Sequence, residues 1–181
     1  MSSPHRLSTP RAAGLAGVLF AILFGASIIL IHSALPEGAA PGSQWLDAGS
    51  LRLRIASLLM PFAGISFLWF IGVVRDGLGG YEDRFFSTVF FGSGLLFLAM
   101  VFSSSAIGAG LAASGHLIDS AAGHNDVAAF GQMEVLSLTK TYAVRMAAVF
   151  MISLATIWLK TGMMPRWLVY TTYASAVGLL L

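Results

Sequence analysis

Residues 115–145 read GHLIDSAAGHNDVAAFGQMEVLSLTKTYAVR, and they separate two groups of long apolar segments. Ionisable side chains gather here, in a chain that is otherwise poor in them; they are His116, Asp119, His124, Asp126, Glu134, Lys140 and Arg145. The flanking segments are apolar over lengths that suit the hydrocarbon core of a bilayer. The stretch is therefore predicted to be a water-facing connection between two membrane helices, with a short helix of its own.

The composition of the 181 residues is typical of a membrane protein. Hydrophobic residues make up 57% and charged residues 10%, whereas a soluble domain carries about 25% charged residues. The mean hydropathy is +0.83. A surface with so little charge favours lipid as its solvent. We therefore expect an all-α fold, a polytopic transmembrane helix bundle that forms a single domain over residues 1–181, in the plasma membrane.

Charge and cysteine content exclude several classes of function. The net charge of +2 comes from basic and acidic residues scattered along the chain, and no dense basic cluster points to nucleic acid. The sequence has no cysteine, which excludes disulfides, cysteine-ligated zinc, iron–sulfur clusters and thiol catalysis. The expected partners are membrane lipids, a second copy of the chain or another membrane protein.

The apolar segments predict about five helices of membrane-spanning type. Their expected ranges are 12–31, 55–74, 85–112, 142–159 and 167–181, with the polar connection over 113–141. The last range gives only about 22 Å of helix, against a hydrocarbon core of about 30 Å. It is interpreted as a helix cut short or as a tilted half-span.

The sequence does not define where the helices begin in two connecting regions. A loop is expected over residues 35–50, which contain Pro36 and Pro41. In the polar connection, Asp126 is a candidate N-cap for a helix beginning at Val127. That helix is expected either to lie along the membrane surface or to lead directly into the helix at 142.

Small residues recur every four positions in the first helix. Gly17, Ala21 and Gly25 share one helical face, and small residues at this spacing let two backbones approach closely in lipid. The pattern predicts that the helix packs through these three positions.

The distribution of Lys and Arg favours a cytoplasmic N-terminus. With that orientation the inner side holds Arg6, Arg11, Arg75, Arg84, Lys160 and Arg166, and the outer side holds Arg52, Arg54, Lys140 and Arg145.

Two stretches carry a family resemblance: residues 68–76, LWFIGVVRD, and residues 160–168, KTGMMPRWL. They resemble small bacterial, often actinobacterial, multi-helix membrane proteins catalogued as a domain of unknown function, which commonly show a Thr-Gly-x-x-Pro-x-Trp-Leu turn between late helices. These motifs are turn and anchor signals without chemistry. The resemblance therefore implies architecture and no activity.

Histidine and carboxylate side chains in the connection form a candidate metal site. His116, Asp119, His124 and Asp126 are ligand types that suit zinc or manganese. Loops in water also collect such residues for caps and solubility. His32 and His116 both follow predicted helices on the outer side, where they could bracket a haem. No strong metal or haem motif is present, so no cofactor is predicted.

Four further residues are candidates for ligand binding: Arg54, Ser104, Glu134 and Arg145. Arg54 and Arg145 would form a positive outer rim that attracts an anionic lipid or solute. Arg145 is expected to reach the outer interface and to pair there with Glu134 or Asp126, because an unpaired charge in lipid is costly. Ser104 either bonds back to its own helix in a closely packed face or belongs to a polar pocket.

Three functions fit these patterns. The leading interpretation is a non-enzymatic membrane module that binds a partner helix, a lipid or a small solute. The second is a small channel or transporter, which should show polar residues along several helices. The third is a membrane enzyme or redox subunit that uses a histidine and carboxylate site on the outer face.

Overall fold

The computed structural model describes residues 9–34, 44–78, 84–114 and 121–181. The described elements are α1 (Thr9–Ala34), α2 (Gln44–Leu78), α3 (Arg84–Ser114), α4 (Ala121–Ser137), the π-helix η1 (Leu138–Ala143), α5 (Val144–Thr161) and α6 (Arg166–Leu180). Every one is helical, and no strand occurs within these ranges. The predicted all-α helix bundle is confirmed.

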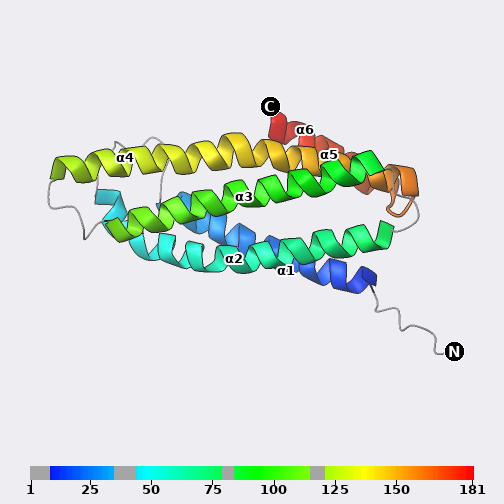
Figure 1. Cartoon of the computed structure of the whole chain (residues 1–181), viewed down its shortest axis with the longest axis horizontal. Coiled ribbons are helices and arrows are strands. Elements are labelled where there is room, and N and C mark those ends of the chain that lie inside the picture. Colours follow the sequence, from blue (N-terminus) through cyan, green and yellow to red (C-terminus); the bar gives the residue numbers. More distant parts are fainter. Residues whose placement is uncertain (1–8, 35–43, 79–83, 115–120) are drawn as a thin grey trace.

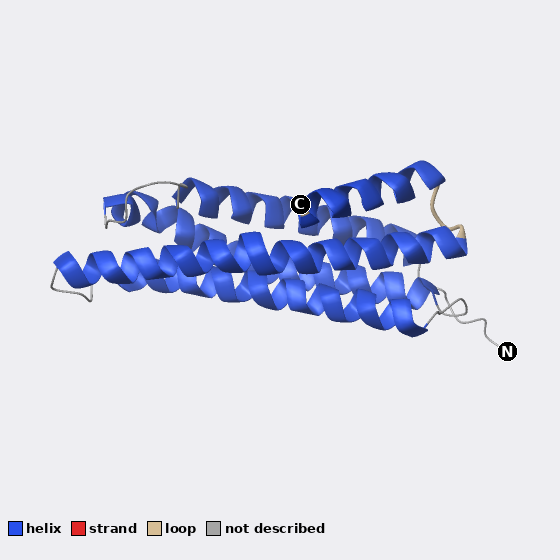
Figure 2. Cartoon of the chain, turned by 90° about the horizontal axis from the view of Figure 1, so that it is seen from above, coloured by secondary structure: helices blue, strands red, loops and turns tan. Residues whose placement is uncertain are grey.

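The helices lie side by side along one long axis and alternate in direction (Figure 1). Helices α4, η1 and α5 follow one another without a break and form a single long rod, whereas α6 is shorter and folds back along α5 (Figures 1 and 2). Four segments are long and apolar enough to cross a membrane: Ala13–Ala34, Leu51–Asp76, Phe85–Ala113 and Asp126–Thr161. The chain is a multi-pass membrane protein.

The helix expected inside the connection 113–141 is present and is longer than predicted, because it begins at Ala121 and not at Val127. Helix α4 begins at Ala121 and continues through η1 into α5, so the helix expected at 142 begins much earlier. Ala128, Gly131 and Val135 follow helical spacing and are buried, while Asp126 is exposed on the other side. Of the two alternatives for this segment, the direct lead into the next helix is confirmed.

Gly131 explains how α4 packs against α3. A Cβ at Gly131 would lie 2.5 Å from Cδ2 and 2.8 Å from Cγ of Leu111, so a side chain at this position would force Leu111 to shift. The absence of a side chain therefore lets the two backbones approach closely, as small residues do in membrane bundles.

Helix α2 also begins earlier than predicted, at Gln44 rather than near residue 55. Arg52 and Arg54 therefore lie inside the helix and not at its start. The Arg52 Nη1 atom donates a hydrogen bond of 3.0 Å to the Ser33 carbonyl. The last carbonyls of a helix lack partners within it, so Arg52 satisfies one at the end of α1 and ties α1 to α2.

The core is organised around the ring of Phe67 on α2, which is 3% exposed. Its centroid lies 4.7 Å from that of Phe20 on α1, 5.5 Å from Phe97 on α3 and 5.2 Å from Phe150 on α5. One side chain of α2 therefore contacts the other three membrane-spanning rods.

Four of the buried serines are satisfied within their own helices. Ser27, Ser66, Ser93 and Ser153 each donate to the carbonyl four residues earlier, at 2.8, 2.9, 2.6 and 2.9 Å. Hydroxyls have no water to bond in a hydrocarbon interior, and this back-bonding removes the penalty of burying them.

The expected packing of α1 through small residues is correct at one position only. A Cβ at Gly17 would lie 3.3 Å from Cδ2 of Phe70 on α2. Ala21 is exposed, and a Cβ at Gly25 would meet nothing within 4 Å. The prediction is wrong for these two, because α1 turns the face that carries Phe20 and Phe24 toward the other helices.

Replacing Gly94 with alanine is expected to destabilise the bundle. The new Cβ would lie 2.8 Å from Cδ1 of Ile71 and 3.1 Å from Cδ2 of Phe150, and both neighbours are buried. Overpacking of this kind costs about 1–3 kcal/mol. The control is Gly92→Ala on the same helix, where nothing lies within 4 Å. Unfolding of the purified variants by sodium dodecyl sulfate measures the difference, and equal stabilities would contradict the close approach at Gly94.

A candidate ligand pocket between α1 and α5

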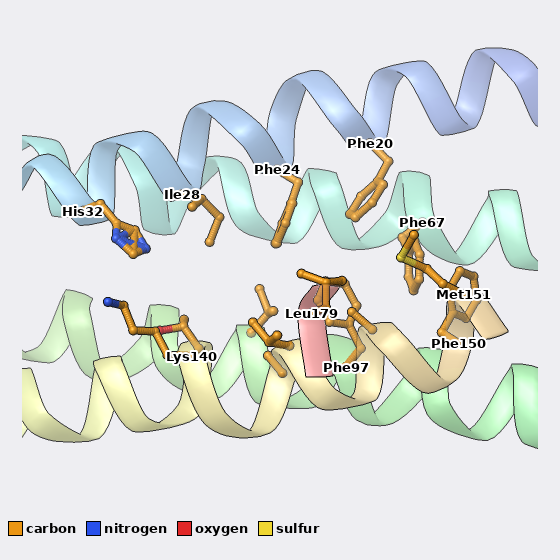
Figure 3. Close-up of a pocket in the computed structure, with 15 residues that line it drawn as sticks. Phe20, Phe24, Ile28, His32, Phe67, Phe97, Lys140, Phe150, Met151 and Leu179 are labelled. Atoms are coloured by element: carbon orange, nitrogen blue, oxygen red, sulfur yellow. The ribbon is translucent and has the colours of Figure 1, made fainter. Parts of the chain in front are cut away.

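A cavity of about 470 Å³ separates α1 from η1 and α5 (Figure 3). Helices α2 and α3 contribute to its floor, and α6 contributes Leu179. Its lining residues are Phe20, Phe24, Ile28, His32, Phe67, Phe97, Val101, Thr139, Lys140, Ala143, Val144, Ala147, Phe150, Met151 and Leu179. Ligand pockets in proteins have volumes of about 300–1,000 Å³, so this cavity is large enough for a small molecule.

Most of the wall is aromatic or aliphatic. Phe20 and Phe24 project from α1 toward the cavity, and Phe97 and Phe150 face them from α3 and α5 (Figure 3). Met151 lies at the end that carries Phe20 and Phe150. An apolar wall of this kind offers dispersion contacts to a hydrocarbon chain and no partner to a polar one.

The polar groups of the wall gather at the opposite end. His32 of α1 and Lys140 of η1 face each other across the gap there (Figure 3). The Lys140 stem runs along the wall, and its ammonium group extends toward the end at which His32 lies. This arrangement lets the charge of a long side chain leave the apolar layer while the stem remains in it.

The π-helix η1 places two of the lining residues. The Val144 N–H donates to the Thr139 carbonyl, which is the i to i+5 bond of a π-turn. Thr139 Oγ1 donates to the Val135 carbonyl at 2.6 Å, and Ser104 Oγ of α3 donates to the same carbonyl at 3.4 Å. Such wide turns occur frequently at functional sites, and here the turn carries Thr139 and Lys140.

Helix α6 closes part of the cavity. Gly162 ends α5 with a φ of 65°, a left-handed conformation that glycine adopts readily. The chain then turns back, and the hydroxyls of Thr156 and Tyr173 lie 2.7 Å apart across the α5–α6 contact. This docking brings Leu179 into the cavity between α1 and α5 (Figure 3).

The predicted metal ligands lie partly outside the described residues. His116 and Asp119 are in the undescribed segment 115–120, and the side chain of His124 is also outside the description. Asp126 is exposed near the start of α4. In the described part of the chain no group of three or more metal-ligating side chains occurs. The metal site and the haem bracketed by His32 and His116 remain predictions.

None of the four predicted ligand-binding residues lines the cavity. Arg54 is exposed on α2. Ser104 is fully buried, and its bond to Val135 joins α3 to α4. It therefore supports the start of η1 from behind the pocket wall.

Arg145 and Glu134 lie on the rod that forms one wall of the cavity. The Arg145 Nη1 atom donates to the Thr141 carbonyl at 2.8 Å, so the side chain folds back one turn toward α4. That direction agrees with the expectation that the charge reaches toward the connection. Among the described carboxylates, neither Glu134 nor Asp126 forms an ion pair with it, and the Thr141 carbonyl takes the place of the predicted acidic partner.

The pocket is not evident from the sequence, in which two of its polar residues, His32 and Lys140, stand out for other reasons. His32 and Lys140 are far apart in the chain, and only the antiparallel arrangement of α1 and the α4–η1–α5 rod brings them together. A usable signal was the repeat of Phe20, Phe24, Ile28 and His32 on one face of α1.

Comparison of the chain with protein-family models, with curated proteins and with solved structures finds no match.

Replacing Tyr173 with phenylalanine is expected to loosen α6. The change removes the hydroxyl that bonds Thr156, and interhelical bonds in membrane proteins contribute about 0.6 kcal/mol on average and up to about 1.7 kcal/mol. Amide hydrogen exchange of α6 should therefore be severalfold faster than in the wild type. Tyr170→Phe is the matched control, because Tyr170 is exposed and forms no side-chain hydrogen bond with another described residue. Equal exchange in both variants would show that the bond does not hold α6 in place.

Proposed function

We propose that this protein is a non-enzymatic integral membrane protein that binds a single amphiphilic molecule in the cavity between α1 and α5. The observation that carries the proposal is the apolar wall of the cavity. Phenylalanine, aliphatic and methionine side chains line its body, and His32 and Lys140 border one end. An amphiphile would place its tail in this apolar body and its head beyond the end that these two residues border.

The depth of the cavity in the membrane supports this assignment. His32 lies at the end of the candidate span Ala13–Ala34, so it is placed near an interface with water. The phenylalanines lie farther into the same span and its neighbours. A bound amphiphile would therefore keep its head at the interface and its tail in the apolar layer, as it does in the bilayer from which it enters.

The wall also argues against the two alternative functions. A channel or transporter needs polar side chains along the whole path of the solute, whereas polar atoms in this wall are confined to one end. An enzyme needs acid, base or metal ligands that converge on a reacting atom. The described wall residues include His32 and Lys140 and no carboxylate.

Filling the cavity is expected to abolish binding. Ala147 of α5 lines the wall and is half-buried, so the side chain of Ala147→Phe would occupy the space of the tail. The probe is hexadecanol that carries a photoactivatable diazirine, incorporated with the protein into phosphatidylcholine nanodiscs. In the wild type, label should be found by mass spectrometry on the cavity-facing residues of α1, α3 and α5, and Ala147→Phe should reduce it at least about tenfold.

Ala99→Phe is the control for this experiment. Ala99 is exposed on α3 and does not line the cavity, so the same change there adds a ring to the lipid-facing surface only. It should leave the labelling unchanged. If Ala147→Phe labels as strongly as Ala99→Phe, the probe marks the outer surface and the proposed function is wrong.

The orientation that we propose is a cytoplasmic N-terminal end in a plasma membrane. Basic anchors at that end support it. The Arg75 guanidinium lies 5.3 Å from the ring centroid of Phe91, and Lys160 Nζ lies 4.5 Å from that of Phe86. With this orientation the His32 and Lys140 end of the pocket opens toward the outer leaflet.

Single cysteines test the orientation, because the chain contains none of its own. Asp126→Cys is at one end of the bundle and Met163→Cys is in the turn at the other, and both positions are exposed. In intact cells a membrane-impermeant maleimide should label Asp126→Cys, and it should label Met163→Cys only after lysis. The reverse pattern would place the N-terminal end outside.

A further inference from the structure

The cavity ends at a layer of aromatic rings on the side away from His32 (Figure 3). The layer consists of Phe67 and of the two rings that flank it, Phe20 and Phe150, at centroid distances of 4.7 and 5.2 Å. Phe90 of α3 is fully buried and stacks on Phe150 from behind the cavity wall, with the ring centroids 4.7 Å apart. Side chains packed at the density of a protein interior leave no space for further atoms. The aromatic layer is therefore a fixed end for a chain that enters the cavity.

The distance from the aromatic layer to the other end of the cavity limits the length of such a chain. On α1 the lining residues run from Phe20 to His32, and these two residues are about 18 Å apart along the helix. Carbon–carbon bonds of about 1.52 Å at tetrahedral angles advance an extended chain by about 1.25 Å each. The cavity is therefore long enough for a straight chain of about 15 carbons.

The volume of the cavity agrees with one chain of this length. A methylene group occupies roughly the volume of a water molecule in the liquid, about 30 Å³, so about 15 carbons need about 450 Å³. The cavity has a volume of about 470 Å³. Phe24 borders the path of the chain on the α1 side, and Leu179 of α6 projects into it (Figure 3). The cavity therefore has room for one chain and not for two.

The cavity is also about as long as one leaflet of a bilayer. Half of the hydrocarbon core is about 15 Å thick, and His32 lies near the end of the candidate span Ala13–Ala34. A straight chain whose head stays at the interface would therefore reach the aromatic layer with its last carbons. It would enter the cavity from the surrounding leaflet without a change of depth.

We infer that the cavity selects its ligand by chain length, and that the ligand is a single-chain amphiphile with a straight alkyl chain of about 15 or 16 carbons. The inference rests on the proposed function, since it names the class of ligand for the same cavity. A shorter chain leaves part of the cavity empty and loses the dispersion contacts there. A longer chain is stopped by the aromatic layer, so it must bend or lift its head out of the interface.

Met151 of α5 gives experimental access to this end of the cavity. It lines the cavity next to the aromatic layer (Figure 3) and is half-buried, whereas Phe67 and Phe150 belong to the buried core. Methionine is unbranched and flexible, and cores tolerate its substitution. The size of the side chain at position 151 should therefore set the last part of the available length.

The test measures how unlabelled straight-chain alcohols compete with the diazirine-bearing hexadecanol in phosphatidylcholine nanodiscs. The competitors are dodecanol, tetradecanol, hexadecanol, octadecanol and eicosanol, which differ only in chain length. The measured quantity is the mole fraction of competitor in the bilayer that halves the labelling of the cavity, which removes differences in partitioning from water. In the wild type tetradecanol and hexadecanol should compete best, dodecanol severalfold more weakly, and eicosanol at least about tenfold more weakly, a difference of about 1.4 kcal/mol.

Two substitutions of Met151 should move this preference in opposite directions. Met151→Ala removes the thioether from the end of the cavity and leaves room for about two more carbons, so octadecanol should compete as well as hexadecanol. Met151→Trp fills the same end, so dodecanol should become the best competitor. Met146→Ala is the matched control on α5, because Met146 packs against the core and does not line the cavity. It should leave the wild-type preference unchanged.

The outcomes separate the inference from the proposed function. If hexadecanol labels the cavity but all the competitors from tetradecanol to eicosanol are equally effective in the wild type, the cavity binds amphiphiles without regard to length and the inference is overturned. If the Met151 variants keep the wild-type preference, or if Met146→Ala shifts it as Met151→Ala does, the end of the cavity does not set the length and the inference is again overturned. If Ala147→Phe does not reduce the labelling, the proposed function itself fails.

Discussion

The contact of Phe67 with rings from the other three membrane-spanning rods determines how this bundle is held together. In lipid, apolar surface gains nothing by leaving the solvent, so helices associate through packing and hydrogen bonds. Aromatic pairs contribute about 0.5–1.5 kcal/mol each beyond their buried area. Phe67 makes such pairs with Phe20, Phe97 and Phe150 at one level of the bundle. Phe20 and Phe24 of α1 also contact the ring of Phe97 on α3.

The cavity follows from the same arrangement. Helix α1 packs along α2, and Arg52 fixes its end through the Ser33 carbonyl. On its other side, α1 meets bulky rings rather than small residues, so it stands away from η1 and α5. The side chains of Phe20 and Phe24 lie in the space between α1 and α5, and they form part of the cavity wall. A closely packed α1, as its glycine pattern predicts, would have left no room for a ligand.

Much of the fold was predictable from the sequence because hydropathy and length decide it. The apolar segments gave the number and order of the rods, and a bilayer admits only helices for them. The errors concern residues whose local meaning depends on tertiary contact. Gly131 allows α3 to approach α4 at Leu111, a contact that its position in the sequence does not reveal. Asp126 is the predicted N-cap of a helix beginning at Val127, but α4 begins at Ala121 and Asp126 lies exposed inside it.

The site was less predictable, for a physical reason that concerns Lys140. Its place in the sequence assigns it to a water-facing connection, where a lysine needs no explanation. The structure makes it part of an unbroken rod, and the wide turn of η1 places it on the face that continues through Val144, Ala147 and Met151. A π-turn has no characteristic sequence pattern. Its cost in free energy is offset by tertiary contacts, here the hydrogen bonds that the hydroxyls of Thr139 and Ser104 donate to the Val135 carbonyl. The stem of Lys140 thereby borders the cavity opposite His32 of α1, a position that depends on the register of the whole rod and not on the residues next to it in the sequence.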